Sequence, residues 1–207
     1  MSLALWQAHL ALTLFVFLLL TRNGNRPGWK LAILALGLGL GWLPVQGMPL
    51  ALFIRSFTDD LSLASLVLLG WLAAQRLGLA PLDDRGRGKA LLLFAALALA
   101  LYPAPLGLSY VDPYRLGFEP RPLLLASGLA ALALLYRRNP LGVAMLVLPT
   151  LGFTLDLKAS GNYWDYLIDP LLGLYCCAWA LQALIRRVLR ALRRPRAPFP
   201  PTTEADL

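Results

Sequence analysis

The sequence has few of the residues that most catalytic and metal sites require. Its 207 residues include one histidine, His9, and two cysteines. A single histidine excludes the HExxH zinc site and the multi-histidine arrangements that bind haem. The adjacent Cys176 and Cys177 lie in an apolar stretch, where we expect them to pack as small hydrophobic residues. No P-loop or dinucleotide-binding fingerprint occurs either, so the sequence predicts no bound metal and no cofactor.

Charged residues are also scarce. They make up 14% of the chain, against 58% hydrophobic residues and a mean hydropathy of +0.64. This composition predicts an all-α, polytopic bundle of transmembrane helices. The formal net charge is +8, but the basic residues are dispersed in short segments without interleaved stacking aromatics. That pattern is typical of membrane topology signals, and we expect no nucleic-acid partner.

Hydrophobic runs between charged or proline-containing segments predict about seven membrane crossings. They cover approximately residues 1–21, 29–45, 60–76, 89–108, 122–136 and 140–156, and a last run from near Asn162 to 187. Pro44 and Pro49 interrupt the chain after the second crossing, which predicts a short interfacial or re-entrant piece through Phe57. Within the second crossing Gly37 and Gly41 form a GxxxG pair, which allows close contact with a neighbouring helix.

The distribution of positive charge predicts the orientation. Fifteen of the 19 lysines and arginines lie in alternate segments, and the other four are Arg55, Arg115, Arg121 and Lys158. Because cytoplasmic loops carry the excess of positive charge, the larger set is predicted to face the cytoplasm. With seven crossings, the N-terminus is then outside and the C-terminus is cytoplasmic. We therefore expect a multi-pass protein of the cell inner membrane.

The C-terminal segment carries six arginines between Arg186 and Arg196. Helical spacing places four of them on one side and apolar residues on the other, so we expect this segment to lie on anionic lipids of the inner leaflet. Its last residues are rich in proline. The sequence thus predicts a transmembrane helical domain at 1–187 and a basic amphipathic, Pro-rich cytoplasmic tail at 188–207.

Four of the predicted crossings are short, with only 15 to 17 consecutive uncharged residues. At about 1.5 Å per residue they measure roughly 22 to 26 Å, against about 30 Å of hydrocarbon. Short aspartate side chains close them on the outer side, so we expect a polar recess in the outer half of the bundle. Its predicted residues are the acids Asp59, Asp60, Asp156, Asp165 and Asp169 and the counter-charges Arg55, Arg121 and Lys158.

Asp165 and Asp169 are the pair in this set whose spacing has the clearest consequence. They are four residues apart, which in one helix places both carboxylates on the same face, where they repel unless one is protonated or partnered. A charged group at membrane depth is by default a functional-site hypothesis. The alternative is structural, because acids in a first helical turn cap free backbone NH groups. Asp59 and Asp60 fit capping as well as they fit a site.

Aromatic residues gather on the same predicted outer side. An interfacial aromatic belt is the favoured explanation for these residues, because of their position at the membrane surface. The alternative is a platform of Tyr114, Tyr163 and Trp164 for a sugar or lipid head group beside the recess.

Three functions remain open. The absence of a catalytic motif favours a non-catalytic subunit or scaffold of a bacterial cell-envelope assembly complex, docked to a larger membrane or periplasmic protein. The second is a membrane enzyme on a lipid or lipid-linked substrate at the outer leaflet. Asp165 or Asp169 would serve as base or metal ligand, and Arg55, Arg121 or Lys158 would hold a phosphate. The third is a small carboxylate-dependent transporter, for which the sequence offers few polar residues toward the inner side. The first is the preferred hypothesis, with the enzyme question left open.

Overall fold

The computed structural model describes residues 3–192 and confirms the all-helical class. Two short antiparallel strands, β1 (Pro44–Val45) and β2 (Met48–Pro49), make a small hairpin. The helices are α1 (Leu3–Leu20), α2 (Pro27–Leu40), α3 (Leu50–Thr58), α4 (Leu63–Leu77), α5 (Asp84–Leu101), the 3-10 helix η1 (Pro113–Gly117), α6 (Arg121–Tyr136), α7 (Pro140–Thr154), α8 (Trp164–Leu167) and α9 (Pro170–Leu192).

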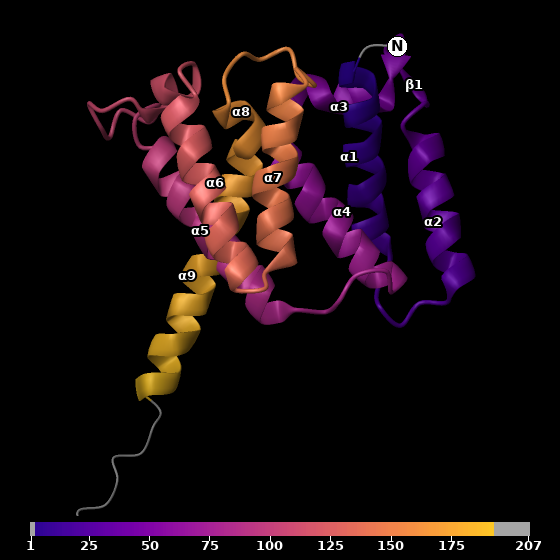
Figure 1. Ribbon diagram of the computed structural model, residues 1–207. Helices are drawn as coiled ribbons and strands as arrows, with labels where there is room; N and C mark the ends of the chain where they lie inside the picture. The colour runs from indigo at the N-terminus through magenta and orange to yellow at the C-terminus, as the bar shows by residue number, and fades with distance from the viewer. Residues whose placement is uncertain (1–2, 193–207) are drawn as a thin grey trace, which may run out of the picture.

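The long helices lie side by side, and the chain alternates between two ends of the bundle (Figure 1). The upper end in that view holds β1, α3, the loop between α5 and α6, and the loop between α7 and α8. The lower end holds the connections α1–α2, α4–α5 and α6–α7, and α9 extends well below it. Helix α5 packs mainly on α9, α7 packs on α4 and α6, and α1 packs on α2, α3 and α4.

Most helices of the bundle are short compared with the length needed to cross a membrane. Within residues 3–192, only α9 is both long and apolar enough to cross a membrane by itself. Helices α1, α2, α4, α6 and α7 are apolar but shorter, and α5 begins with a charged turn. The predicted helical class is thus confirmed, whereas the seven predicted crossings are not supported by these lengths.

The last predicted crossing is interrupted, which corrects the expectation for Asp165 and Asp169. Helix α8 ends at Leu167, and Ile168 is extended, with φ −149° and ψ 142°. Pro170 then begins α9, a position that suits proline because its missing NH would have no helical partner. The two aspartates therefore lie in different elements, and the prediction that they share one helix face is wrong.

The predicted boundary between 187 and 188 has no counterpart in the helix. Helix α9 is continuous from Pro170 to Leu192, so its basic segment continues the axis of the bundle helix. Lying flat on a leaflet would require a bend that the described residues do not contain. The Pro-rich remainder of the predicted tail, with Arg193, Arg194 and Arg196, lies outside the described residues.

The core is centred on α4, α5, α7 and α9. Phe94 of α5 and Met145 of α7 are fully buried there. Cys176 is also fully buried and carries a free thiol, as expected for a cysteine that packs as a small hydrophobic residue. Two glycines bring α5 and α9 together, because Gly88 faces the ring of Trp179 and Gly173 faces the ring of Tyr102.

At the lower end, basic side chains close the C-terminus of α1. The guanidinium of Arg76 donates hydrogen bonds to the backbone oxygens of Leu18 and Thr21. The buried ammonium of Lys30 donates to the oxygen of Asn23, at 3.1 Å, and to that of Arg76. The last carbonyls of a helix have no partner within it, so cations near them are stabilising.

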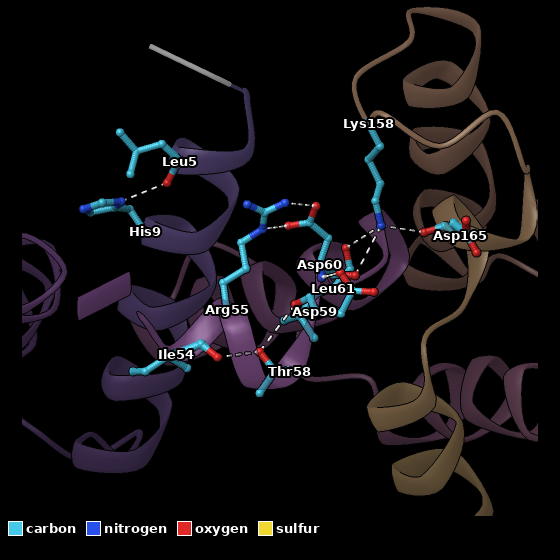
Figure 2. Close-up of polar contacts among 10 residues, drawn as sticks. All are labelled: Leu5, His9, Ile54, Arg55, Thr58, Asp59, Asp60, Leu61, Lys158 and Asp165. Atoms are coloured by element: carbon cyan, nitrogen blue, oxygen red, sulfur yellow. Dashed lines mark hydrogen bonds and ion pairs between the residues drawn. The ribbon is translucent and has the colours of Figure 1, made fainter. Parts of the chain in front are cut away.

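The glycine pair Gly37 and Gly41 lies where α2 meets α1. A Cβ at Gly37 would be 3.0 Å from the Cα of Thr13, and one at Gly41 would be 2.6 Å from Cδ2 of His9. The His9 ring is itself fixed, since its Nδ1 lies 2.8 Å from the oxygen of Leu5 and it stacks on Trp42 (Figure 2). The GxxxG pair therefore does permit a close helix contact.

Replacing Gly37 by valine tests that contact. The new side chain meets the backbone of α1, which cannot move aside locally, so Gly37→Val should lower the free energy of unfolding by about 1–3 kcal/mol. Gly39→Val is the matched control, because it makes the same change in the same helix with nothing within 4 Å. Thermal unfolding followed by circular dichroism compares the two. Equal losses in both variants would show that helix propensity alone explains the effect.

Candidate functional site

The predicted recess residues gather in part at the upper end of the bundle. Arg55 and Asp60 make a bidentate ion pair, with Nε to Oδ1 at 2.5 Å and Nη2 to Oδ2 at 2.7 Å. Helix α3, which carries Arg55, ends at Thr58, and Asp59 follows with φ 60°. The hydrogen bond to Asp60 raises the pKa of Arg55, although burial opposes that shift. The pair uses two of the three guanidinium nitrogens of Arg55, Nε and Nη2.

Lys158 links this segment to the loop after α7. Its Nζ donates to three backbone oxygens, those of Asp60 at 3.3 Å, Leu61 at 3.2 Å and Asp165 at 2.9 Å (Figure 2). Burial lowers the pKa of Lys158, and nearby carboxylates, Asp60 first among them, oppose the shift. The ammonium group therefore donates its three hydrogens to loop carbonyl oxygens, which leaves it little capacity to bind a ligand.

Asp165 accepts hydrogen bonds from two neighbouring segments. The hydroxyl of Tyr114 in η1 lies 3.0 Å and 3.1 Å from its two carboxylate oxygens, and Ser160 donates to the same group. Burial is the largest cause that raises the pKa of Tyr114 to about 12, and the charge of Asp165 adds to it. This contact fastens η1 to the start of α8.

Asp169 joins the N-termini of two helices. Its Oδ1 accepts from the backbone NH of Leu172 at 2.8 Å, which caps α9. Its Oδ2 accepts from the backbone NH of Ser62 at 2.8 Å and from the hydroxyl of Ser65, at the start of α4. The residue is only 7% exposed. The expected alternative of helix capping thus describes the contacts of Asp169, and both carboxylate oxygens are occupied.

The predicted aromatic platform differs from the observed arrangement. Tyr163 and Trp164 are buried, at 0% and 4% exposure, so neither presents a ring at the surface. The Tyr163 hydroxyl lies 2.5 Å from that of Thr150, and the indole NH of Trp164 donates to the oxygen of Pro113 at 2.9 Å. Only Tyr114 stays partly exposed. The rings pack the α7–α8 loop against the bundle.

Two predicted recess residues do not join the others. Asp156 is exposed, at the left-handed φ of 49° that ends α7, and Arg121 is exposed at the start of α6. In the part of the chain that the structure describes, neither side chain makes a hydrogen bond or an ion pair. They lie on separate surface elements. Five of the eight predicted recess residues have side chains in the network, namely Arg55, Asp60, Lys158, Asp165 and Asp169, whereas the Asp59 carboxylate accepts from the adjacent NH of Asp60.

The sequence reasoning missed several members of this network. The Ser62 hydroxyl caps α4 by accepting from the NH of Ser65, and the Ser65 hydroxyl donates to Asp169. Asn162 is fully buried; its side chain donates to the oxygen of Tyr114 at 3.0 Å and accepts from the NH of Trp164 at 2.9 Å. Gly117 lies so close to Asn162 that a Cβ there would overlap it. A serine before a helix is a recognisable cap signal, whereas the Asn162 contact depends on distant segments.

The carboxylates of the network accept hydrogen bonds from donors within the protein. Among residues 3–192, no three His, Cys, Asp or Glu side chains gather closely enough to hold a metal ion. The buried carboxylate Asp169 is held by backbone and hydroxyl donors, and Asp60 by a guanidinium. A general base would need a carboxylate free to take a proton from a bound substrate. The geometry instead resembles a set of links between helix ends.

Comparison of the chain with models of known protein families, with curated proteins and with solved structures finds no match.

Removing the Asp169 carboxylate tests its role as a link. Asp169→Ala leaves the buried NH groups of Ser62 and Leu172 without acceptors, so it should lower the free energy of unfolding by about 2–4 kcal/mol. Asp156→Ala removes an exposed carboxylate and should change stability by less than about 0.5 kcal/mol. Chemical unfolding of both variants measures the difference. Similar stability of the two variants would contradict the linking role.

The raised pKa of Tyr114 predicts a loss of stability at high pH. Because its pKa rises from 10.0 when unfolded to about 12 when folded, the folded state holds this proton more tightly. Its contribution is therefore complete below pH 10 and is lost as the pH rises toward 12. The wild type should lose more stability across that range than Tyr114→Phe, measured by unfolding at each pH. Parallel pH profiles would show that Tyr114 titrates normally.

Proposed function

We propose that this protein is an integral, multi-pass protein of a bacterial inner membrane that acts as a non-catalytic subunit or scaffold in cell-envelope assembly. In this proposal the helices α1, α2, α4, α5, α6, α7 and α9 cross the membrane. Helix α3 lies at its outer surface. The upper end in Figure 1 faces outward and the lower end faces the cytoplasm.

The apolar surface of the bundle supports a membrane location. Along α6, Leu125, Leu129 and Leu132 repeat at helical spacing and are 61–66% exposed. Only Ser127 and Leu134 of that helix are buried. In water, a large continuous surface of this kind would drive association, whereas in a bilayer it contacts lipid tails at no cost.

The shorter helices are compatible with crossing in a locally thinned bilayer. At about 1.5 Å per residue, helices of 14 to 18 residues measure about 21–27 Å. Spans shorter than the hydrocarbon are accommodated by thinning of the bilayer or by side chains that reach the interface. The upper-end links support the same view, because they satisfy polar groups at the depth where hydrocarbon would begin.

The charge distribution supports the orientation. The lower end carries Arg22, Arg26, Arg85, Arg137 and Arg138 in its connections, and the described part of α9 adds further arginines beyond it. The upper-end cations are fewer, and Arg55 and Lys158 are occupied within the network. Positive charge at cytoplasmic ends is the usual determinant of topology.

One observation carries the non-catalytic role. The carboxylates of the network at Asp60, Asp165 and Asp169 are each bound by donors from other helix ends, so their chemistry is used in holding the bundle together. An enzyme acting on a lipid is the second candidate, because an apolar groove opens beside Arg55 and Asp60. A carboxylate-dependent transporter is less well supported, since the network lies at one end of the bundle.

Cysteine accessibility tests the orientation. In a background with Cys176→Ser and Cys177→Ser, Ser109→Cys places a thiol in the exposed upper loop and Asn23→Cys places one at the exposed lower end. An impermeant thiol reagent should label the upper site in intact spheroplasts and the lower site only after permeabilisation. Reversed labelling would overturn the orientation, and release of the protein by alkaline carbonate would overturn the membrane location.

Co-purification tests the scaffold role against the enzyme. Mild-detergent purification should recover a stoichiometric membrane or periplasmic partner, and Asp165→Asn, which keeps hydrogen-bonding capacity, should leave the complex and cell growth unchanged. A clean monomer whose cellular function is lost in Asp165→Asn, with normal abundance and unfolding temperature, would favour the enzyme instead.

A further inference from the structure

Two adjoining hollows form a groove between α1, α3, α4 and the start of α9. Their volumes are about 410 Å³ and 380 Å³. They share the apolar side chains of Phe15, Leu19, Leu61, Leu69 and Leu171. Phe15 and Leu19 are largely exposed, so the groove is open along the side of the bundle.

The groove has the length of one lipid leaflet. Along α1 it runs from Gln7 to Leu19, which at about 1.5 Å per residue is about 18 Å. Half of the hydrocarbon thickness of a bilayer is about 15 Å. The groove begins at the upper end and extends past the middle of α4 to Leu72, and along α1 as far as Leu19, one residue before that helix ends.

The upper end of the groove is polar. Arg55, Thr58, Asp59 and Asp60 line it there, and Figure 2 shows the Arg55 and Asp60 side chains side by side. Gln7 also lines this part and is only 4% exposed, yet its side-chain Nε2 has no hydrogen-bond partner among the described residues. A buried amide without a partner costs about 1–3 kcal/mol, so this position favours a ligand that supplies an acceptor.

The shape of the groove discriminates between occupants. Each hollow falls within the range of about 300–1,000 Å³ that is usual for sites that bind small molecules. An extended hydrocarbon chain is far narrower than a helix. The groove therefore fits an acyl chain better than a transmembrane helix of a partner or of a second copy.

The charges at the groove mouth select the head group. One guanidinium and two carboxylates line it, and the ammonium of Lys158 lies behind Asp60 on the backbone oxygens. The exposed carboxylate of Asp59 is directed toward no cation within salt-bridge distance in the described chain. Mixed charge of this kind complements a zwitterion: a phosphate beside Arg55 and an ammonium beside Asp59.

We propose that this groove binds an amine-bearing zwitterionic phospholipid, with an acyl chain along α1 and α4 and the head group at Arg55 and Asp59. The amide of Gln7 donates to an ester oxygen at the top of the chain. This inference rests on the proposed membrane location. Bound in this way, one lipid fills the space lined by α1, α4 and Leu171 of α9.

Native mass spectrometry of the full chain tests the proposal. The protein is purified in mild detergent and exchanged with equal amounts of phosphatidylethanolamine and phosphatidylglycerol. The wild type should retain the former preferentially. Ala11→Trp fills the groove, and Leu19→Trp narrows it at an exposed position where folding is not at risk. Both should reduce retained lipid about tenfold.

Ala126→Trp is the matched control, because it adds the same ring to an exposed site on α6, outside the groove. It should retain lipid as the wild type does. Equal retention in Leu19→Trp and Ala126→Trp would overturn the groove, and a preference for phosphatidylglycerol would overturn the head-group assignment. Carbonate extraction of each variant keeps the two proposals separate, since a protein that stays in the membrane without groove-dependent lipid contradicts only this inference.

Discussion

The contact on which the bundle depends most is the carboxylate of Asp169 between the starts of α4 and α9. A helix start leaves NH groups without partners, and burying two such starts together would be costly. One carboxylate serves both, with Leu172 on one oxygen and Ser62 and Ser65 on the other. Its negative charge also lies at the positive ends of two helix dipoles. Two segments 107 residues apart in sequence are thereby held at one depth.

The other contacts at the upper end also use charged side chains to satisfy polar groups of neighbouring segments. Lys158 closes carbonyls of three residues, Asp165 receives the Tyr114 hydroxyl, and Arg55 neutralises Asp60. Each link joins elements that are distant in sequence or separated by a turn. Together they convert a set of charges that would be expensive in an apolar setting into cross-links between loops. Because these carboxylates and cations are bonded to groups of the protein itself, few of them remain free to react with a substrate at this end.

The sequence predicted the helices well because their signals are local. Asn139 before Pro140 and Pro122 near the start of α6 mark helix starts that the structure places within a residue or two. The break between α8 and α9 was missed, because an apolar run with two aspartates reads as one amphipathic helix. Pro170 was the available signal, and its preference for a first helical turn should have outweighed the spacing of the acids.

The sequence could predict that the candidate site residues lie at one end of the bundle, but not which of them are in contact. Grouping the acids with Arg55 and Lys158 followed from topology, since all lie at the same ends of alternating segments. Which of them touch depends on loop geometry: the φ of 60° at Asp59 brings Asp60 back to Arg55, and the φ of 49° at Asp156 leaves that side chain outside. Burial of Tyr163 and Trp164 likewise depends on the docking of η1, through Gly117 and Asn162. No local pattern encodes these contacts.

The uninterrupted course of α9 gives the molecule a mechanical property. A rod of 23 residues is about 34 Å long, and its first turn is clamped by Asp169. Packing on α5 also holds the rod as far as Trp179, and the 13 residues beyond that point project as a stiff arm about 20 Å long. A force applied to the arginine-bearing tip would reach the opposite side of the bundle through one stiff element and arrive at the start of α4.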